Sequence, residues 1–174
     1  MTTDIKPIKS IKELEIIMKE HNPDRSYLEV LKAIDIPYDE WEKYFTWKEE
    51  RYTRNIVFKN DKYEFLVICL EEGQDSPIHD YDSKEAWIHI LRGQLKEEKY
   101  KKREDGKIER VSTVTLGPHD FSFMSGHVGL HRYVNTFESR TVSLHLYVNP
   151  LKKWNEYDPA TNSFRQIEVG YDNI

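Results

Sequence analysis

Hydrophobic residues along the first third of the chain recur at the three- to four-residue spacing of a helix face. These positions predict a helix over residues 10–18. Ser10 and Glu13 have the spacing of a capping box, which marks the start of this helix. Apolar positions over residues 27–34 predict a second helix, and Pro37 followed by acidic residues predicts the start of a third. The N-terminal part of the chain is therefore predicted to be helical.

From about residue 51 the period of the pattern falls to two, which predicts strands. In a small barrel, one face of each strand packs outward and the other faces the lumen. Asp105-Gly106 and Gly117-Pro118 predict turns, and residues 149–174 are expected to close over one end of the barrel. The strand candidates are residues 52–57, 63–70, 87–93, 95–100, 111–116, 121–124, 130–135 and 141–148.

Length and charge narrow the class of protein. At 174 residues the chain has the size of one domain, and we predict a single domain in which residues 1–50 lead into a barrel of residues 51–174. A net charge of −5 gives no electrostatic reason to expect nucleic acid or an anionic membrane as a partner. The first residues lack the apolar core of a signal peptide, and no apolar run approaches membrane-spanning length. We therefore expect a cytoplasmic protein, and we expect a monomer.

Aromatic residues and one cysteine are the remaining compositional signals. Eleven tyrosines, seven phenylalanines and four tryptophans suit strands and an aromatic-lined pocket, with Trp87 and Trp154 as expected pocket walls. The single cysteine, Cys69, excludes an internal disulfide and lies in the apolar run of residues 65–70. A small buried thiol is expected there rather than a nucleophile.

The stretch from Gly73 to Trp87 carries the first candidate metal site. Five residues separate Gly73 from His79, and one residue separates His79 from Tyr81. Residues two apart in a strand point to the same side, so both side chains are able to reach one metal ion inside a barrel. The spacing resembles the beginning of a cupin metal site, with a tyrosine where a second histidine is expected.

Two further polar clusters lie on later strand candidates. His131 and Asn135 have a spacing that resembles the second cupin motif, and Ser143, His145 and Tyr147 alternate along the last clear strand. Histidines that converge from distant strands inside a barrel suit Fe(II), Ni(II), Cu(II) or Mn(II). No spacing in the chain matches a structural zinc site.

Four segments, in order along the chain, resemble the cysteine dioxygenase family, whose members are small iron-dependent thiol dioxygenases of the cupin superfamily. The resemblance runs from about Tyr52 to Asp158, and it implies an all-β cupin barrel, jelly-roll-like, with a short N-terminal helical region. Each segment is a weak signal alone, and their common order makes the resemblance specific. The segments are Tyr52-Thr53-Arg54-Asn55, Ile78-His79-Asp80, Gly129-Leu130-His131-Arg132 and Val142-Ser143-Leu144-His145-Leu146-Tyr147.

The resemblance places His79, Tyr81 and His131 at the metal-ligand positions, which are three histidines in the family. The expected metal is Fe(II), with another divalent transition metal as the alternative. Two possibilities stay open for Tyr81. It binds as a phenolate, because a metal depresses the pKa of a coordinating group, or it swings out and water or Glu85 takes its place.

The resemblance also implies how the substrate is held and activated. Arg54 is expected to bind the carboxylate of cysteine with its guanidinium fork, and Tyr52 and Trp154 are further candidate substrate-binding residues. In the family, a tyrosine hydroxyl lies near the bound thiol and dioxygen.

Here that tyrosine is Tyr147, with Ser143 and His145 as its hydrogen-bond support. Ala86 stands where many animal members carry a cysteine that crosslinks to the tyrosine, so no thioether forms in this chain.

These residues predict an iron-dependent thiol dioxygenase that oxidises cysteine, or a related small thiol carboxylate, to its sulfinate with O2. One alternative is a family member whose altered metal site acts on another substrate. The other is a non-catalytic cupin that binds a ligand. The presence of Arg54 together with the polar row of residues 143–147 argues against the last alternative, because a disused pocket has no physical need for that set.

Overall fold

The structure is a computed structural model, and the chain divides into two compact units. The helices lie in the first unit, residues 1–43, and the strands lie in the second, residues 44–174. The predicted change from helix to strand is confirmed, whereas the single domain stays a prediction. The described residues are 6–22, 24–80, 83–125 and 129–174.

Three short helices in the described part of the first unit begin where the sequence predicts. Ser10 Oγ accepts a hydrogen bond of 3.2 Å from the Glu13 amide, and Ser26 Oγ accepts one of 3.2 Å from the Leu28 amide. These bonds satisfy amides that have no partner within the helix. No helix in the described stretches is long and apolar enough to cross a membrane. The helices are α1 (Ile11–Glu20), α2 (Tyr27–Lys32) and α3 (Tyr38–Glu42).

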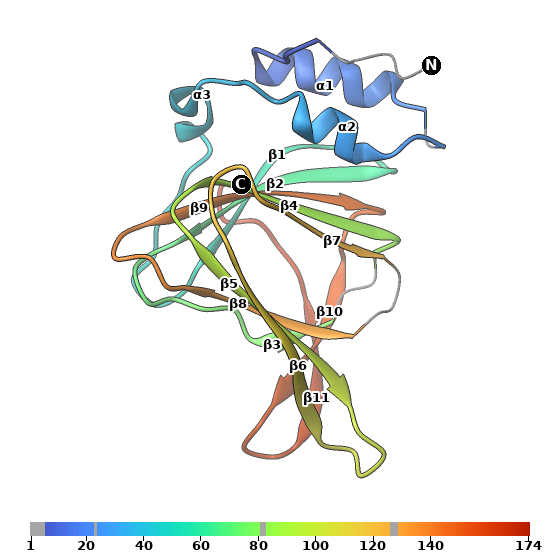
Figure 1. Cartoon of the computed structure of the whole chain (residues 1–174), viewed down its shortest axis with the longest axis vertical. Coiled ribbons are helices and arrows are strands. Elements are labelled where there is room, and N and C mark those ends of the chain that lie inside the picture. Colours follow the sequence, from blue (N-terminus) through green and yellow to red (C-terminus); the bar gives the residue numbers. More distant parts are fainter. Residues whose placement is uncertain (1–5, 23, 81–82, 126–128) are drawn as a thin grey trace. The chain divides into compact units, whose positions relative to one another are not determined.

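The second unit consists of two antiparallel sheets, which confirms the predicted all-β class. Its strands are β1 (Thr53–Lys59), β2 (Tyr63–Leu70), β3 (Ile78–His79), β4 (Glu85–Arg92), β5 (Leu95–Lys102), β6 (Ile108–Leu116), β7 (Phe121–Ser125), β8 (Leu130–Asn135), β9 (Thr141–Val148), β10 (Lys153–Asp158) and β11 (Ser163–Glu168). Among the described residues, one sheet has the order β1-β2-β9-β4-β7 and the other has the order β11-β10-β3-β8-β5-β6 (Figure 1).

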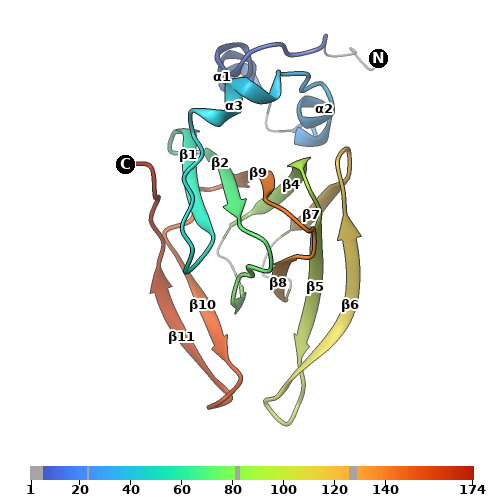
Figure 2. The same ribbon diagram turned by 90° about the vertical axis from the view of Figure 1, so that its left-hand side faces the viewer.

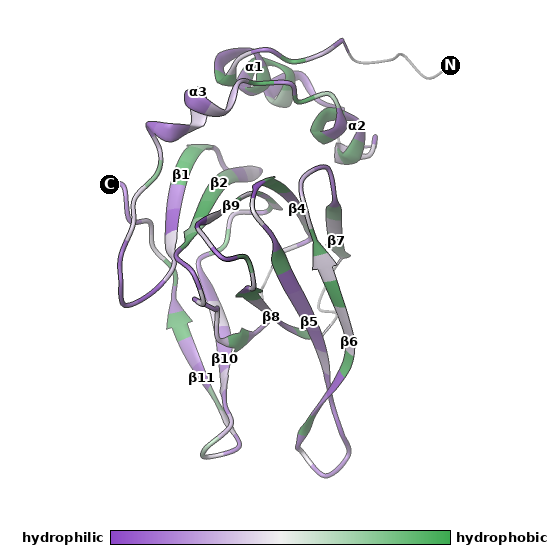
Figure 3. Cartoon of the chain, turned by 60° about the vertical axis from the view of Figure 1, so that its left-hand side comes forward, coloured by the Kyte–Doolittle hydropathy of each residue, from purple (hydrophilic) through white to green (hydrophobic). Residues whose placement is uncertain are grey.

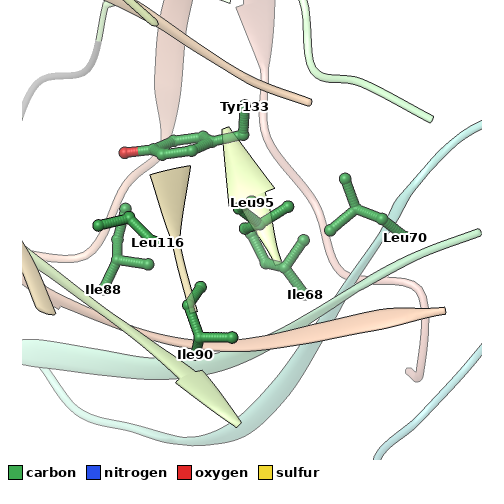
Figure 4. Close-up of a cluster of buried hydrophobic side chains, with 7 residues drawn as sticks. All are labelled: Ile68, Leu70, Ile88, Ile90, Leu95, Leu116 and Tyr133. Atoms are coloured by element: carbon green, nitrogen blue, oxygen red, sulfur yellow. The ribbon is translucent and has the colours of Figure 1, made fainter. Parts of the chain in front are cut away.

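The hydrophobic core of the second unit lies between the two sheets. One cluster combines side chains of β2 and β4 from the five-stranded sheet with side chains of β5, β6 and β8 from the six-stranded sheet. Burying an aliphatic or aromatic side chain of this size stabilises the fold by roughly 1.5–3 kcal/mol. The cluster therefore holds the sheets face to face. Figure 4 shows its members, Ile68, Leu70, Ile88, Ile90, Leu95, Leu116 and Tyr133.

β2 and β9 form the centre of the five-stranded sheet. Every residue of both strands is buried, and Figure 3 colours β2 as hydrophobic along most of its length. In their antiparallel register Leu66 lies opposite His145 and Ile68 lies opposite Ser143, so these side chains share the inner face. Cys69 is also buried, and burial raises the pKa of its thiol to about 12, which confirms the expected buried thiol.

The C-terminal residues differ from the sequence prediction. Residues 149–174 are predicted to close over one end of the barrel, but β10 and β11 instead form a hairpin that extends the six-stranded sheet. β10 also pairs with β3, where Glu156 lies opposite His79. The hairpin has few apolar positions, so its period-two signal is weak. Figure 2 shows the β10–β11 and β5–β6 hairpins at the two edges of this sheet.

Candidate active site

The two histidines of the predicted metal site lie side by side on adjacent strands. His79 of β3 lies opposite His131 of β8 in the antiparallel register. Their ring centroids are 4.3 Å apart, and both side chains are buried. The structure thus brings together two residues that are far apart in sequence, and their role as ligands stays a prediction.

Both imidazoles are in the neutral form that binds metals. Burial lowers the pKa of His79 to about 4 and lowers the pKa of His131 well below its usual value. Nδ1 of His79 lies 2.8 Å from the carbonyl oxygen of Pro77, and it must be the donor because a carbonyl oxygen only accepts. That bond fixes the tautomer of His79 and leaves the lone pair on Nε2 for a ligand.

Two neutral imidazoles in this arrangement fit a divalent transition metal as part of a ligand set. Within the described stretches, no group of three or more His, Cys, Asp or Glu side chains is placed to hold a metal ion. Tyr81, the third predicted ligand, lies outside the described residues. Glu85, the alternative to Tyr81, accepts a hydrogen bond of 3.4 Å from Nε1 of Trp87, which draws its carboxylate toward that ring.

Ser143, His145 and Tyr147 form a hydrogen-bonded row on β9. Ser143 Oγ lies 2.9 Å from His145 Nε2, and Tyr147 Oη lies 3.4 Å from Nδ1 of the same ring. A neutral imidazole donates from one nitrogen and accepts at the other, so one hydroxyl donates to the ring and the other accepts from it. Burial lowers the pKa of His145 to about 3 and raises the pKa of Tyr147, so both side chains are neutral at neutral pH.

Arg54 of β1 points toward the same region and packs against aromatic rings. Its guanidinium carbon lies 5.0 Å from the ring centroid of Trp154 and 5.8 Å from that of Tyr147. Its Nε donates a hydrogen bond of 3.4 Å to the carbonyl of Gly170. Its Nη2 is buried and has no hydrogen-bond partner in the part of the chain that the structure describes. A buried guanidinium nitrogen of this kind suits a ligand carboxylate.

One small cavity connects these groups. Tyr52 lines it, as predicted for a substrate-binding residue, and burial raises the pKa of its phenol to about 12. Trp154 also lines it, with its ring 4.7 Å from that of His79, whereas Trp87 packs against Phe123. Neither Trp87 nor His131 is among the described lining residues. These are Tyr52, Arg54, Ile68, Leu70, Ser76, His79, Leu95, Tyr133, Ser143, His145, Tyr147 and Trp154.

Glu64 of β2 is a residue of this region that the sequence pattern did not indicate. It is fully buried and lies opposite Tyr147 in the register. Its Oε1 lies 3.9 Å from Nη2 of Arg54 and accepts a hydrogen bond of 3.0 Å from the Leu151 amide. Its Oε2 accepts a hydrogen bond of 2.5 Å from the Tyr171 hydroxyl. The available signal was a single acidic residue in an otherwise uncharged strand, because a buried charge requires a partner.

The C-terminal segment, residues 170–173, lies along the outer edge of β1 at Arg54. The Arg54 amide donates to Asp172 Oδ2 at 2.9 Å, and the Asp172 amide donates to the Arg54 carbonyl at 2.7 Å. Arg51 and Lys48 pair with the Asp172 carboxylate at 2.6 and 2.8 Å. Burial opposes ionisation of Asp172, but the hydrogen bonds from these two cations outweigh it and lower its pKa. The segment therefore supports the strand that carries Arg54.

Comparison with known protein families agrees with this geometry. A sequence model described as cysteine dioxygenase type I matches residues 4–160, which is most of the chain. The chain belongs to the cysteine dioxygenase type I family. The predicted resemblance to cysteine dioxygenases is thereby confirmed. The matched range includes all of the candidate site residues, from Tyr52 to Trp154.

Cysteine dioxygenases of several vertebrates are similar to this chain. Cysteine dioxygenase type 1 of Rattus norvegicus is 30% identical over 146 residues, which cover 82% of this chain and 73% of the rat protein. The Danio rerio protein is 30% identical over 138 residues, which cover 76% of this chain and 68% of that protein. The Homo sapiens protein is 27% identical over 146 residues, which cover 82% of this chain and 73% of that protein. These similarities support an oxygenase of the thiol dioxygenase kind.

Solved structures share the fold at low sequence identity. A Klebsiella pneumoniae protein with a double-stranded β-helix domain has a TM-score of 0.53 at 11% identity, covering 62% of this chain and 80% of that chain. A protein of Thermus thermophilus has a TM-score of 0.52 at 15% identity, covering 62% of this chain and 92% of that chain. These structures show the fold alone, and they confirm the predicted cupin barrel.

Proposed function

We propose that the protein is an iron-dependent thiol dioxygenase that oxidises cysteine, or a related small thiol carboxylate, to its sulfinate. Both atoms of O2 are added to the thiol sulfur, so the sulfur is oxidised and dioxygen is reduced. The observation that supports this function most directly is that His79 and the row of Ser143, His145 and Tyr147 line one cavity.

His79 and His131 would hold Fe(II), with Tyr81 as the proposed third ligand. When bound, the metal supplies the Lewis acidity and redox chemistry that bring thiol and dioxygen together. The neutral state of both imidazoles means that neither has to lose a proton before it binds. The hydrogen bond from Nδ1 of His79 to Pro77 keeps Nε2 directed to the ligand side.

Arg54 binds the substrate carboxylate in this proposal, and Nη2 is the donor with capacity for it. The ring of Trp154 lies 5.0 Å from the guanidinium carbon of Arg54 and 4.7 Å from the ring of His79, and in this proposal it forms the wall along which the substrate lies. Tyr52 also lines the cavity.

Tyr147 donates a hydrogen bond to the reacting oxygen or sulfur. Burial raises its pKa, so the phenol keeps its proton at neutral pH. His145 orients the hydroxyl through the 3.4 Å contact at Nδ1, and Ser143 fixes the opposite nitrogen of the ring at 2.9 Å. The row thus presents a donor of fixed direction to the cavity.

The test is an oxygen-consumption assay on purified, iron-loaded protein with cysteine in air. We expect oxygen uptake to match sulfinate formation, measured by mass spectrometry. If the native protein consumes no oxygen while Tyr81→His does, the proposed function is wrong for this chain. Purified protein that binds no metal would instead favour a ligand-binding cupin.

A second measurement addresses Tyr81 itself. Ligation of Fe(III) by a phenolate gives a charge-transfer band in the visible spectrum, so we expect such a band in the oxidised, iron-loaded protein and its loss in Tyr81→Phe. A spectrum without the band would count against ligation by Tyr81 and leave the third position to water or Glu85.

A further inference from the structure

The positive charge of Arg54 at the cavity already has a counter-ion within the protein. Arg54 is the one charged side chain among the described residues that line the cavity, and Oε1 of Glu64 lies 3.9 Å from its Nη2. The two side chains are only 6% and 0% exposed, so water screens their attraction weakly. Glu64 therefore offsets the charge of Arg54 before any ligand binds.

Glu64 is held in this position by hydrogen bonds from two other segments. The Leu151 amide donates to Oε1 at 3.0 Å, and the Tyr171 hydroxyl donates to Oε2 at 2.5 Å. Turning the carboxylate away from Arg54 would break both bonds in a buried region, where unsatisfied donors are costly. The carboxylate is thus a fixed feature of the guanidinium's surroundings.

The guanidinium of Arg54 is also engaged on its other sides. Its Nε donates to the Gly170 carbonyl, and the rings of Trp154 and Tyr147 lie 5.0 and 5.8 Å from its central carbon. Aromatic faces stabilise a cation in the absence of an anion. Much of the stabilisation that a substrate carboxylate would provide is therefore supplied within the protein.

The carboxylate of Glu64 already lies beside the guanidinium of Arg54. A thiol carboxylate that binds to Arg54 would therefore bring a second anion close to the first. Like charges in a buried site disfavour each other, and specificity depends on such repulsion as much as on attraction. A small thiol without a carboxylate leaves the Arg54–Glu64 pair undisturbed.

We propose that Glu64, acting through Arg54, sets the substrate range of the site. It lowers the preference for thiols that carry a carboxylate, so small thiols without one are accepted with comparable efficiency. This inference rests on the proposed thiol dioxygenase function and specifies its substrate class.

The experiment compares cysteine with 2-aminoethanethiol, which is cysteine without its carboxylate. The ratio of their kcat/KM values is measured for the native iron-loaded protein, for Glu64→Gln, and for Glu98→Gln. Glu98 is a suitable control because it is buried like Glu64, but its carboxylate is bonded to Tyr100 and Arg110, which are not among the described lining residues. Melting temperatures establish that each variant is folded.

We expect the native ratio to be within about tenfold of unity, and Glu64→Gln to raise it at least about tenfold in favour of cysteine, the scale of one charge-assisted hydrogen bond. Glu98→Gln should leave the ratio unchanged. Glu64→Asp, which withdraws the carboxylate by one methylene group, should give an intermediate ratio. A folded Glu64→Gln protein with the native ratio would overturn the inference, because a purely structural ion pair changes stability and not selectivity.

Binding without turnover separates this inference from the proposed function. Dissociation constants of both thiols are measured by calorimetry under anaerobic conditions on the same proteins. If neither thiol is oxidised in air, the proposed function fails, while the ratio of dissociation constants still tests Glu64. If Glu64→Gln does not fold, the ratio for Glu64→Asp decides, and an unchanged ratio there contradicts the inference.

Discussion

The two sheets contribute different chemistry to the same cavity. The six-stranded sheet supplies neutral groups, namely the imidazole of His79 and the aromatic side chains of Tyr133 and Trp154. The five-stranded sheet supplies the charged Arg54 and the polar row of residues 143–147. The neutral wall suits metal ligation, and the charged and polar wall suits recognition and proton control of a substrate.

This separation predicts that substitutions in one wall act mainly on one property of the site. The walls meet through the hydrophobic cluster between the sheets and through the ring of Trp154, which lies 5.0 Å from the guanidinium carbon of Arg54. Substitutions in the six-stranded sheet should therefore change metal content first. Substitutions in the five-stranded sheet should leave metal content intact and change turnover, substrate affinity or stability.

The largest effect is expected for His131→Ala, which removes one of the two paired imidazoles. Iron affinity should fall by more than about a hundredfold, beyond the loss seen when only an outer-shell partner of a ligand is removed. Oxygen uptake with cysteine should fall to background. The measurement is metal content after dialysis, with His89→Ala as the control, because the His89 ring stacks on the ring of Phe121 at 4.5 Å, whereas the His131 ring lies against that of His79. Full iron content in His131→Ala would contradict the proposed metal site.

Tyr147→Phe should have the next largest effect, and it should act on turnover alone. Loss of the hydroxyl removes the proposed donor to the reacting atoms, so kcat should fall by about a hundredfold while the KM for cysteine changes little. Iron content should equal that of the native protein, because Tyr147 belongs to the other wall. A loss of iron in this variant would show that the walls are not independent.

Arg54→Lys should change affinity more than turnover. Lysine keeps the positive charge beside Glu64 but lacks the guanidinium fork, so the KM for cysteine should rise about tenfold. Steady-state kinetics test this, with Arg140→Lys as the matched control, since Arg140 is an exposed arginine that pairs with Glu71. Equal KM values for Arg54→Lys and the control would argue against carboxylate binding by Arg54.

Asp172→Asn should have the smallest effect on the site and should act on stability. The pKa of Asp172 is lowered in the fold, so its ionised form stabilises the protein above the unfolded-state pKa of about 3.9. This contribution is lost as the pH falls through the lower folded-state pKa. The substitution should reduce the free energy of unfolding at neutral pH by about 2 kcal/mol.

Urea unfolding at neutral and at acid pH measures that difference. It should shrink as the pH falls below about 4, because the carboxylate of the unfolded chain then becomes protonated while that of the folded protein stays ionised to a lower pH. A difference that stays constant with pH would show that the charge of Asp172 does not stabilise the fold. Iron content should be unchanged, because Asp172 supports β1 in the five-stranded sheet.

Local signals in the sequence predicted the fold well where one segment determines its own structure. Ser10 caps α1 as its spacing with Glu13 indicates. The Asp105-Gly106 turn joins β5 and β6, where Gly106 has a φ of +81°, a conformation that glycine adopts without strain. Period-two alternation on β9 correctly placed Ser143, His145 and Tyr147 on one face.

Features that depend on distant partners could not be predicted in this way. β10 and β11 have few apolar residues, and β10 obtains its place in the sheet by pairing with β3. The sequence pattern predicts an apolar strand that contains Glu64 but gives no partner for its carboxylate. The fold supplies these partners, Arg54 and Tyr171, from distant segments. Such contacts join residues that are far apart in sequence, so no local sequence pattern predicts them.

The C-terminal segment has a practical consequence for anyone who handles this protein. The Gly170 carbonyl, the Tyr171 hydroxyl and the Asp172 carboxylate all contact Arg54 or Glu64. Proteolytic trimming after residue 169 would remove these three groups together. It would loosen the cavity wall that carries Arg54 without removing any residue that lines the cavity. We expect a preparation nicked at this point to change in substrate selectivity and not in metal content, so intact mass should be verified before any kinetic comparison. A purification handle is better fused at the opposite terminus.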